Sequence, residues 1–280
     1  MSNMAGQQTR HLNLLEKQLP EGLVVTSSWL RQRGYSRQLL SHYLQSGWLR
    51  QPTRGVYQRP RGSLSWQQVM ISLQTVLKEP LVVGGRTALE LQGYAHYLRQ
   101  TMKEVHLYGA EPPPTWLEKL PAKVRFIYRN SRNLFPAEAD KRSFRGLLKD
   151  PNAQPTAGAD FVVQPWGQWD WQIVMSSPER AVLELLDELP GRETFEQVDK
   201  FMEGLANLSP QRLQKLLTRC RSIKVKRLFF FFADRHQHAW LKRIDRAAVH
   251  LGKGKRMLVK GGQLDRAYQI TVPENLDAIQ

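Results

Sequence analysis

Cysteine is almost absent from this chain, which has a single residue of that type, Cys220, in 280. One cysteine excludes an intramolecular disulfide and a cysteine-rich zinc site, and it suits a reducing compartment. Long hydrophobic runs are also missing, since no stretch approaches the roughly 20 apolar residues of a membrane span. The first residues, MSNMAGQQTRHLNLL, lack the hydrophobic core of a signal peptide. We therefore expect a soluble, cytoplasmic protein with no membrane partner.

Acidic residues are scarce as well, with 25 Asp and Glu against 41 Lys and Arg, so the formal net charge is +16. The excess lies at the two ends of the chain. Residues 1–62 hold nine basic and two acidic residues, residues 209–280 hold sixteen and five, and the middle is near neutral. Basic segments attract polyanions because binding releases condensed counterions. The distribution indicates nucleic-acid contact, with a merely solvated basic surface as the alternative.

Catalytic motifs are missing too. The chain has no HExxH, GxSxG, HRD or DFG motif, and its LGKGKR run lacks the GxxxxGK[ST] spacing of a phosphate loop. His236 and His238 stand two apart, so they do not share a helix face as a metal pair would. A phosphoryl- or nucleotidyl-transfer site needs metal carboxylates and a phosphate loop. We expect no enzyme and no cofactor, with an enzyme that modifies a partner or cuts nucleic acid as a minor alternative.

The first sixty residues have the element order of a winged helix-turn-helix. Leu12, Leu15 and Leu19 mark an amphipathic helix over residues 9–19. A second helix, SSWLRQRG, follows a short extended piece and is capped by Ser27 or Ser28, and a third, SRQLLSHYLQSG, is capped by Ser36. The run WLRQPTRGVYQRP then predicts a hairpin in which Trp48-Leu49 pairs with Val56-Tyr57 around a turn at 52–55. Three helices and a hairpin, with a short link between the second and third helix, are typical of this motif.

The outward face of the third helix is the predicted DNA-reading surface. Leu39, Leu40, Tyr43 and Leu44 recur at helical spacing and should face the core. The opposite face would enter the major groove, where Arg pairs with guanine and Gln with adenine. A wing arginine could reach phosphate or the minor groove. The predicted DNA-binding residues are Ser36, Arg37, Gln38, Ser41, His42, Gln45, Arg50, Arg54 and Arg59. A polar, solvated helix face with no ligand is the alternative.

The rest of the chain predicts a larger mixed domain over residues 63–280. Helical segments are expected at 64–77, 87–94, 176–189, 194–205, 210–218 and 223–232, and strands at 81–83, 105–108, 124–128, 161–163 and 171–175. The final MLVKGGQLDRAYQITVP predicts two strands around a Gly-Gly turn. Residues 149–160 are rich in Pro, Gly and Asp and predict a loop. A subdivision near 150–176 stays open. The fold class is α+β, a winged helix-turn-helix followed by a mixed α/β domain.

The basic C-terminal region offers a second candidate surface. Phe229–Phe232 cover all faces of one helical turn, which is usual for a buried helix, while an exposed part would be a partner-binding patch. The basic residues around this turn could meet a polyanion or an acidic protein surface, or could be solvated. The predicted partner surface is made of Lys224, Lys226, Arg227, Lys242, Arg243, Arg246, Lys253 and Lys255.

Two sets of motifs give the chain a family resemblance. The N-terminal GYSRQLLSHYLQSGWLRQPTRGVYQRP resembles the winged-helix domain of the AbiEi abortive-infection antitoxins. The C-terminal SSPERAVLELLDELP, LLTRCRSIKVKRLFFFFADRHQHAW, LGKGKR and AYQITVP resemble the same family, in the same order. The resemblance covers nearly the whole chain, with residues 95–160 the least diagnostic.

The resemblance implies an antitoxin of a bacterial type IV toxin–antitoxin system that acts in phage defence. It implies that the N-terminal domain binds inverted repeats of double-stranded operator DNA in its own promoter and represses the operon. It also implies that the C-terminal domain neutralises a nucleotidyltransferase-like toxin, directly or indirectly. The motif residues carried over are Ser177, Pro178, Glu179, Arg180, Arg221, Lys224, Lys226, Arg227, Lys253 and Lys255. A stand-alone transcriptional regulator, whose C-terminal domain senses a ligand or dimerises, is the alternative.

Overall fold

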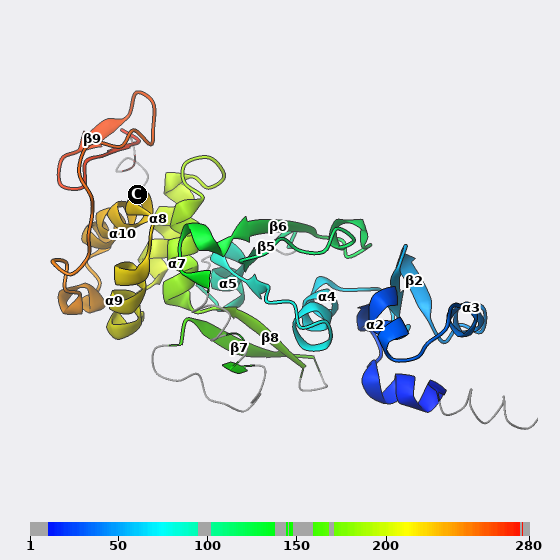
Figure 1. Cartoon of the computed structure of the whole chain (residues 1–280). Helices are drawn as coiled ribbons and strands as arrows, with labels where there is room; N and C mark the ends of the chain where they lie inside the picture. Colours follow the sequence, from blue (N-terminus) through cyan, green and yellow to red (C-terminus); the bar gives the residue numbers. More distant parts are fainter. Residues whose placement is uncertain are drawn as a thin grey trace, which may run out of the picture.

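The computed structural model describes residues 11–94, 102–137, 144, 146–147, 159–167, 171–274 and 276. Its first part is a small helical module with a three-stranded sheet, drawn in blue in Figure 1. Residues 11–18 are helical and precede β1 (Val24–Thr26), α2 (Ser27–Gln32), α3 (Arg37–Gln45), β2 (Arg50–Thr53) and β3 (Val56–Gln58). The strands pair antiparallel in the order β1-β3-β2. This is the predicted winged helix-turn-helix.

Two local details of this module differ from the prediction. The N-cap of α2 is Thr26, whose hydroxyl accepts a hydrogen bond from the backbone N–H of Trp29, so neither Ser27 nor Ser28 caps the helix. The hairpin register is also shifted, because Thr53 pairs with Val56 and Arg50 with Gln58. Gly55 has a φ of +78°, and this left-handed conformation lets the chain reverse within Arg54-Gly55.

A helix that changes type connects the module to the rest of the chain. α4 (Trp66–Ile71) begins at a capping box of Ser65 and Gln68 and continues as a π-helical turn, η1 (Ser72–Val76). The hydroxyl of Ser72 donates to the carbonyl of Gln68 and accepts from the backbone N–H of Val24 in β1. Two residues further on, the buried Gln74 side chain bonds the backbone of Leu81 and Val174. The connector therefore packs on the module at one side and on the second sheet at the other (Figure 1).

That second sheet has five strands in the order β6-β5-β4-β8-β7. The strands are β4 (Val82–Val83), β5 (Glu104–Gly109), β6 (Arg125–Asn130), β7 (Phe161–Trp166) and β8 (Trp171–Ser176). The β5–β6 and β4–β8 pairs are parallel, and β4–β5 and β7–β8 are antiparallel. The sheet thus joins β4, β5 and β6, which precede residue 150, to β7 and β8, which lie within the 150–176 segment. The predicted loop at 149–160 lies outside the described residues up to residue 158.

Helices pack on this sheet around one central, almost fully buried helix. α7 (Pro178–Asp187) contacts α5 (Gly85–Leu91), α8 (Phe195–Gly204), α9 (Pro210–Arg219) and α10 (Ile223–His236). Ser177 caps α7, and Pro178 occupies its first turn. Inside this helix, the Glu184 carboxylate accepts from Arg180, Ser176 and the backbone N–H of Gly85. The buried charge pair is therefore fully hydrogen-bonded, as a buried ion requires.

The C-terminal end of the described chain is a small hairpin beyond the helices. β9 (Gln263–Asp265) pairs antiparallel with β10 (Ile270–Val272) at the end of the molecule opposite the winged helix (Figure 1). The strands reverse through residues 266–269, so Gly261-Gly262 precede β9 and do not form the turn between the strands as predicted. In the described residues, no helix is long and apolar enough to cross a lipid bilayer.

Candidate nucleic-acid interface and C-terminal basic surface

The third helix presents the predicted polar face to solvent. The Ser36 hydroxyl accepts a hydrogen bond from the backbone N–H of Leu39, which fixes the start of α3. Leu40 and Tyr43 are buried, and Tyr43 packs against Tyr35, whose hydroxyl donates to the carbonyl of His11. The exposed side chains on the other face are Arg37, Gln38, Ser41, His42 and Gln45. The inward and outward residues of α3 therefore divide as the sequence predicts.

The wing places two of its arginines in solvent. Arg50 begins β2 and Arg54 lies at the tip of the β2–β3 hairpin, and both side chains are exposed. Trp48, between α3 and the wing, is also exposed, at 43%. Exposed cationic side chains on a wing are of the kind that contacts phosphate or enters the minor groove in winged-helix proteins.

Arg59 differs from the other predicted DNA contacts because its side chain is held inside the module. Its guanidinium donates to the backbone carbonyls of Glu16 and Leu19 and pairs with the carboxylates of Glu16 and Glu21. Only 12% of the side chain is exposed. Arg59 therefore closes the C-terminal end of the first helix, where unpaired carbonyls attract a cation. The prediction that it contacts DNA is wrong.

Lys226 and Arg227, like Arg59, are bonded inside the protein, so they do not belong to the predicted C-terminal surface. Both side chains are buried in α10. Lys226 donates to the carbonyl of His250, and Arg227 donates to the carbonyls of Leu251, Gly254 and Gln269. Burial of an unpaired charge is costly, so these bonds to carbonyl oxygens are what lets the two cations lie inside. They hold the 250–256 segment on α10 and are not partner contacts.

Lys224 and Arg246 also form hydrogen bonds and ion pairs with other residues of the protein. Lys224 donates to the carbonyls of Asp187 and Leu189 at the C-terminal end of α7 and pairs with the Asp187 carboxylate. Arg246 forms a two-pronged ion pair with Asp234 and donates to the Tyr268 hydroxyl, although 44% of its side chain is exposed. Lys224 therefore stabilises a helix end, and Arg246 is only partly accessible.

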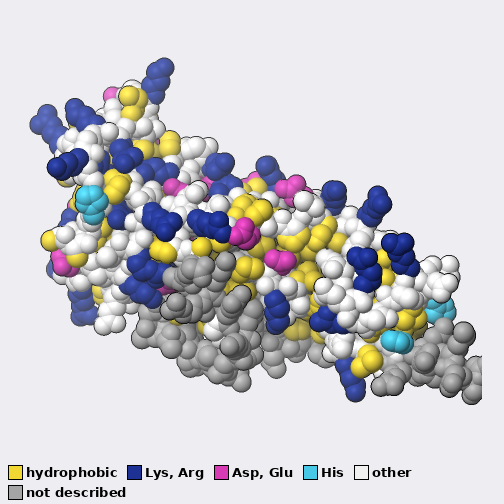
Figure 2. Space-filling view, viewed as in Figure 1, with side chains coloured by type: hydrophobic (Ala, Val, Ile, Leu, Met, Phe, Trp, Pro, Cys, Tyr) yellow, Lys and Arg dark blue, Asp and Glu magenta, His cyan; other side chains and the backbone are white. Residues whose placement is uncertain are grey.

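The remaining predicted residues form an exposed basic surface. Lys242 and Arg243 lie in η4 (Ala239–Arg243), and Lys253 and Lys255 lie in the following loop. Figure 2 shows Lys and Arg side chains gathered over the end of the molecule that carries β9. Arg256 and Lys260 are also exposed there, and Met257 is 75% exposed. Arg256 and Lys260 were absent from the predicted set, and their place in the same basic run is the signal that could have added them.

The aromatic turn of α10 is internal. Phe229, Phe230 and Phe232 are fully buried, and Phe231 is half-buried against the same core. Phe230 stacks on Tyr268, and Phe229 packs on Trp240. The turn therefore belongs to the core of the C-terminal helices, as expected for a helix with apolar residues on every face.

The described residues offer little for covalent or metal chemistry. No group of three or more His, Cys, Asp or Glu side chains within them could hold a metal ion. Burial raises the pKa of the Cys220 thiol to about 11, so the thiolate that would act as a nucleophile is suppressed. Glu179 of the C-terminal motif accepts hydrogen bonds from the backbone N–H of Ser209 and from the Arg212 side chain, both at the start of α9. These groups brace helices.

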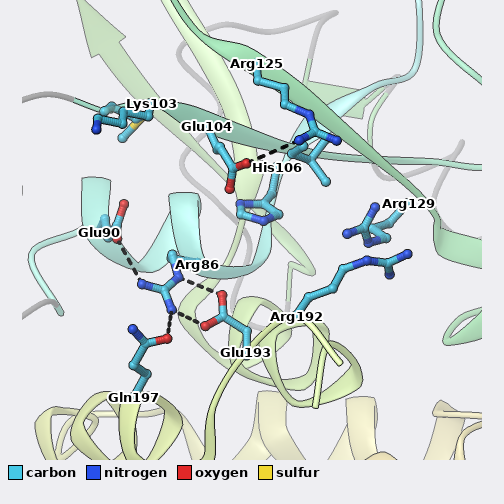
Figure 3. A pocket seen from close by; sticks show the side chains of 12 residues that line it. Arg86, Glu90, Lys103, Glu104, His106, Arg125, Arg129, Arg192, Glu193 and Gln197 are labelled. Atoms are coloured by element: carbon cyan, nitrogen blue, oxygen red, sulfur yellow. Dashed lines mark hydrogen bonds and ion pairs between the residues drawn. The ribbon is translucent and has the colours of Figure 1, made fainter. Parts of the chain in front are cut away.

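A cavity of about 470 Å³ lies apart from both basic surfaces, over β5 and β6. Its lining includes basic residues from α5, from β6 and from the loop before α8, together with a histidine of β5 (Figure 3). They are Arg86, Lys103, His106, Arg125, Arg129 and Arg192. No sequence motif marked this cavity, because its residues come together only through strand pairing and the packing of α5 and the 192–197 segment against the sheet.

Family models cover nearly the whole chain. Residues 8–100 match a model described as the transcriptional regulator AbiEi antitoxin N-terminal domain, and residues 102–273 match one described as transcriptional regulator, AbiEi antitoxin, type IV toxin–antitoxin system. The crystal structure of the RV2827C protein from Mycobacterium tuberculosis matches with a TM-score of 0.54 at 19% identity, covering 94% of this chain and 89% of that one. That likeness concerns the fold. No curated protein matches the chain.

Proposed function

The chain belongs to the AbiEi family of type IV antitoxins and transcriptional regulators, and from this premise we propose a division of labour between its two ends. The winged helix binds operator DNA in its own promoter and represses the operon. The C-terminal part neutralises a nucleotidyltransferase-like toxin, directly or indirectly. The protein works as a binding protein without a cofactor.

The exposed face of α3 is the observation that supports DNA binding most strongly. Five polar side chains, from Arg37 to Gln45, are exposed on α3, and Arg54 is exposed at the tip of the wing. Arg37 and Gln38 lie in the first turn of the helix, which is the part of a recognition helix that reaches base edges. Arg50 and Arg54 supply charge for the phosphate backbone, which positions the protein and gives most of the affinity.

Inverted repeats in an operator require two copies of this module. One winged helix reads one half-site, and the two half-sites are related by a two-fold axis that the protein must reproduce. Two molecules would therefore occupy one operator, and occupancy can be cooperative even when the free protein is a monomer.

DNA upstream of the gene tests this part of the proposal. Pure protein is titrated onto labelled upstream DNA, with and without excess competitor DNA, over a range of salt concentrations. We expect competitor-resistant binding in two steps. Binding that competitor DNA removes would show that the positive charge attracts phosphate without reading sequence, and it would end the autorepressor proposal.

The C-terminal basic surface supports the second role. Lys242, Arg243, Lys253 and Lys255 are exposed, and Figure 2 shows Lys and Arg side chains gathered over the end of the molecule that carries β9. A surface of exposed positive side chains favours a partner with an acidic surface and speeds the association of the two proteins. Co-expression with the toxin tests the role: growth should be rescued by the wild-type chain.

The alternative function is a stand-alone regulator whose C-terminal part senses a ligand or dimerises. The cavity over β5 and β6 is the observation that favours it. Rescue from the toxin separates the two, since a stand-alone regulator would bind DNA and leave the toxin active.

A further inference from the structure

The cavity over β5 and β6 is lined by one face of these two strands. Glu104 pairs with Arg125 and His106 with Ile127 in parallel register, so all four project to the same face. The alternate residues Val105 and Leu107 are fully buried in the core on the other face. Figure 3 shows Arg86 of α5 beside Glu193, so α5 and the segment around Glu193 meet at one side of the cavity.

Two of the basic residues in the cavity form ion pairs with acidic side chains of the same protein. The Arg86 guanidinium forms a two-pronged pair with Glu193 and also donates to the Gln197 amide oxygen. Arg129 forms a two-pronged pair with Glu188, with N–O distances of 2.6 and 2.8 Å. Paired guanidinium groups of this kind are geometrically fixed, so these residues hold the walls in place.

Three other basic residues line the mouth with weaker partners or none. Arg125 is 78% exposed and lies 4.0 Å from Glu104. Arg192 is 65% exposed and lies 3.5 Å from Glu188, whose carboxylate already binds Arg129. Lys103 is exposed, and no ion pair to another described residue is found for it. Loose surface pairs contribute little energy, so these cations are available to an anion.

His106 adds a hydrogen-bond donor at the floor. The buried Thr87 hydroxyl accepts the backbone N–H of His106 at 3.0 Å and lies 3.1 Å from Nδ1 of the ring. A buried hydroxyl hydrogen needs an acceptor, and among the described residues Nδ1 is the one it reaches. The remaining proton of the neutral ring then resides on Nε2. Burial lowers the pKa of His106, so this neutral form is the one present near pH 7.

We propose that this cavity binds a small organic phosphate, with the phosphate held at the mouth by Lys103, Arg125 and Arg192. The carboxylates of Glu90 and Glu104 accept hydrogen bonds from hydroxyl or amino groups of the organic part, and His106 donates to it. Carboxylates repel a bare phosphate but accept hydroxyl hydrogens, so the mixed lining favours a ligand that carries both kinds of group.

The size of the cavity supports the organic part of this assignment. Its volume of about 470 Å³ lies inside the range of about 300–1,000 Å³ that small-molecule sites occupy. Inorganic phosphate is only a few times larger than a water molecule, which takes up about 30 Å³ in the liquid. Phosphate alone would therefore leave most of the cavity to water. The proposal rests on the cavity and not on the antitoxin role, so either can fail alone.

Calorimetric titration of the full-length protein tests the proposal. The probes are ribose 5-phosphate, AMP and ATP, with ribose, adenosine and inorganic phosphate as their matched controls. We expect saturable one-to-one binding of at least one organic phosphate, and much weaker binding of its control. Lack of saturable binding by all three phosphates would overturn the assignment, and equal binding of inorganic phosphate would overturn its organic part.

Charge variants separate a built site from general attraction to a basic protein. Replacing both Lys103→Gln and Arg125→Gln should weaken binding of the phosphorylated probe at least about tenfold. Lys119→Gln removes an exposed charge outside the cavity and should leave binding unchanged. Equal weakening by the Lys119 variant would show that the phosphate senses only net charge, and it would sink the proposal.

Discussion

Arg37 lies exposed in the first turn of α3, directly after the N-cap Ser36. From this position its guanidinium can pair with the O6 and N7 atoms of a guanine. We expect Arg37→Ala to weaken operator binding by about 1–3 kcal/mol and to relax the preference at one base pair. The measurement is fluorescence anisotropy on the operator and on a set of single-base variants of it.

Lys119→Ala is the control for Arg37, because it removes one exposed positive charge from a helix far along the chain from the winged module. If Arg37→Ala weakens all base variants equally, Arg37 contacts a phosphate and not a base, and the assignment of base reading to this residue fails.

Arg54, at the tip of the wing, is the residue for which a phosphate contact is expected. Each phosphate contact adds about one to the slope of log affinity against log salt. Arg54→Ala should therefore weaken binding to all sequences alike and make that slope shallower by about one. Titrations at several salt concentrations measure it, and an unchanged slope would remove the wing from the interface.

The roles of single charged residues could be predicted only where the partner is local. The exposure of Arg37 and Gln38 followed from helical spacing, because the apolar residues that define the buried face lie within the same helix. The burial of Lys226 and Arg227 could not be predicted from helical spacing. Their acceptors are backbone carbonyls 24 to 42 residues away, and a carbonyl leaves no mark in the sequence that would indicate which cation it binds.

At the scale of elements, helices and strands were predictable where periodicity and caps agree. α3 begins at its predicted cap Ser36. α7 lies within the predicted 176–189 segment, but its cap is Ser177 and not Ser176, for which the spacing to Glu179 indicates a capping box. The hairpin registers could not be predicted, because the alternation of apolar and polar residues does not fix which residues reverse the chain. The wing turns at Arg54-Gly55, and the last hairpin turns at 266–269. The π-helical turn of η1 was also unforeseen, and its first residue, Ser72, bonds the distant strand β1.

One ion cluster ties two of these elements together and gives a pH prediction. Asp199 in α8 accepts from Arg235 and from the ring of His236, both in α10. Burial alone would raise the pKa of Asp199, but the hydrogen bonds and charges of His236 and Arg235 outweigh it, and the pKa falls below its ordinary value of 3.8. A carboxyl with a lowered pKa stabilises the fold at neutral pH and loses this contribution as the pH falls through its folded pKa.

Asp199→Asn should therefore cost about 1–2 kcal/mol of unfolding free energy at pH 7, since the bonds lost join charged groups that keep some solvent contact. The difference from wild type should persist down to about pH 4 and shrink below it. Urea denaturation across this range measures it, with Glu118→Gln as an exposed control. A pH-independent difference would mean that packing, and not charge, holds α8 on α10.

On the scale of the whole molecule, the connector α4–η1 determines how the two ends can be studied. It bonds β1 through Ser72 and the second sheet through Gln74, and Trp66, Val69 and Met70 are buried along it. The division after residue 62, predicted from the winged-helix pattern, falls just before this helix. A deletion there would uncover apolar surface on both sides, so the functions of the two ends are better separated by surface substitutions than by truncation.

Such substitutions give the last prediction. Arg37→Ala with Arg54→Ala should abolish repression of a promoter reporter and leave rescue from the toxin intact, because both side chains are exposed and no ion pair to another described residue is found for either. Lys253→Gln with Lys255→Gln should do the reverse, since these lysines are exposed at the opposite end. Lys119→Gln with Lys200→Gln, which removes the same charge from exposed positions elsewhere, should preserve both activities. Loss of both activities in either of the first two variants, with unfolding midpoints unchanged, would show that repression and neutralisation share one surface.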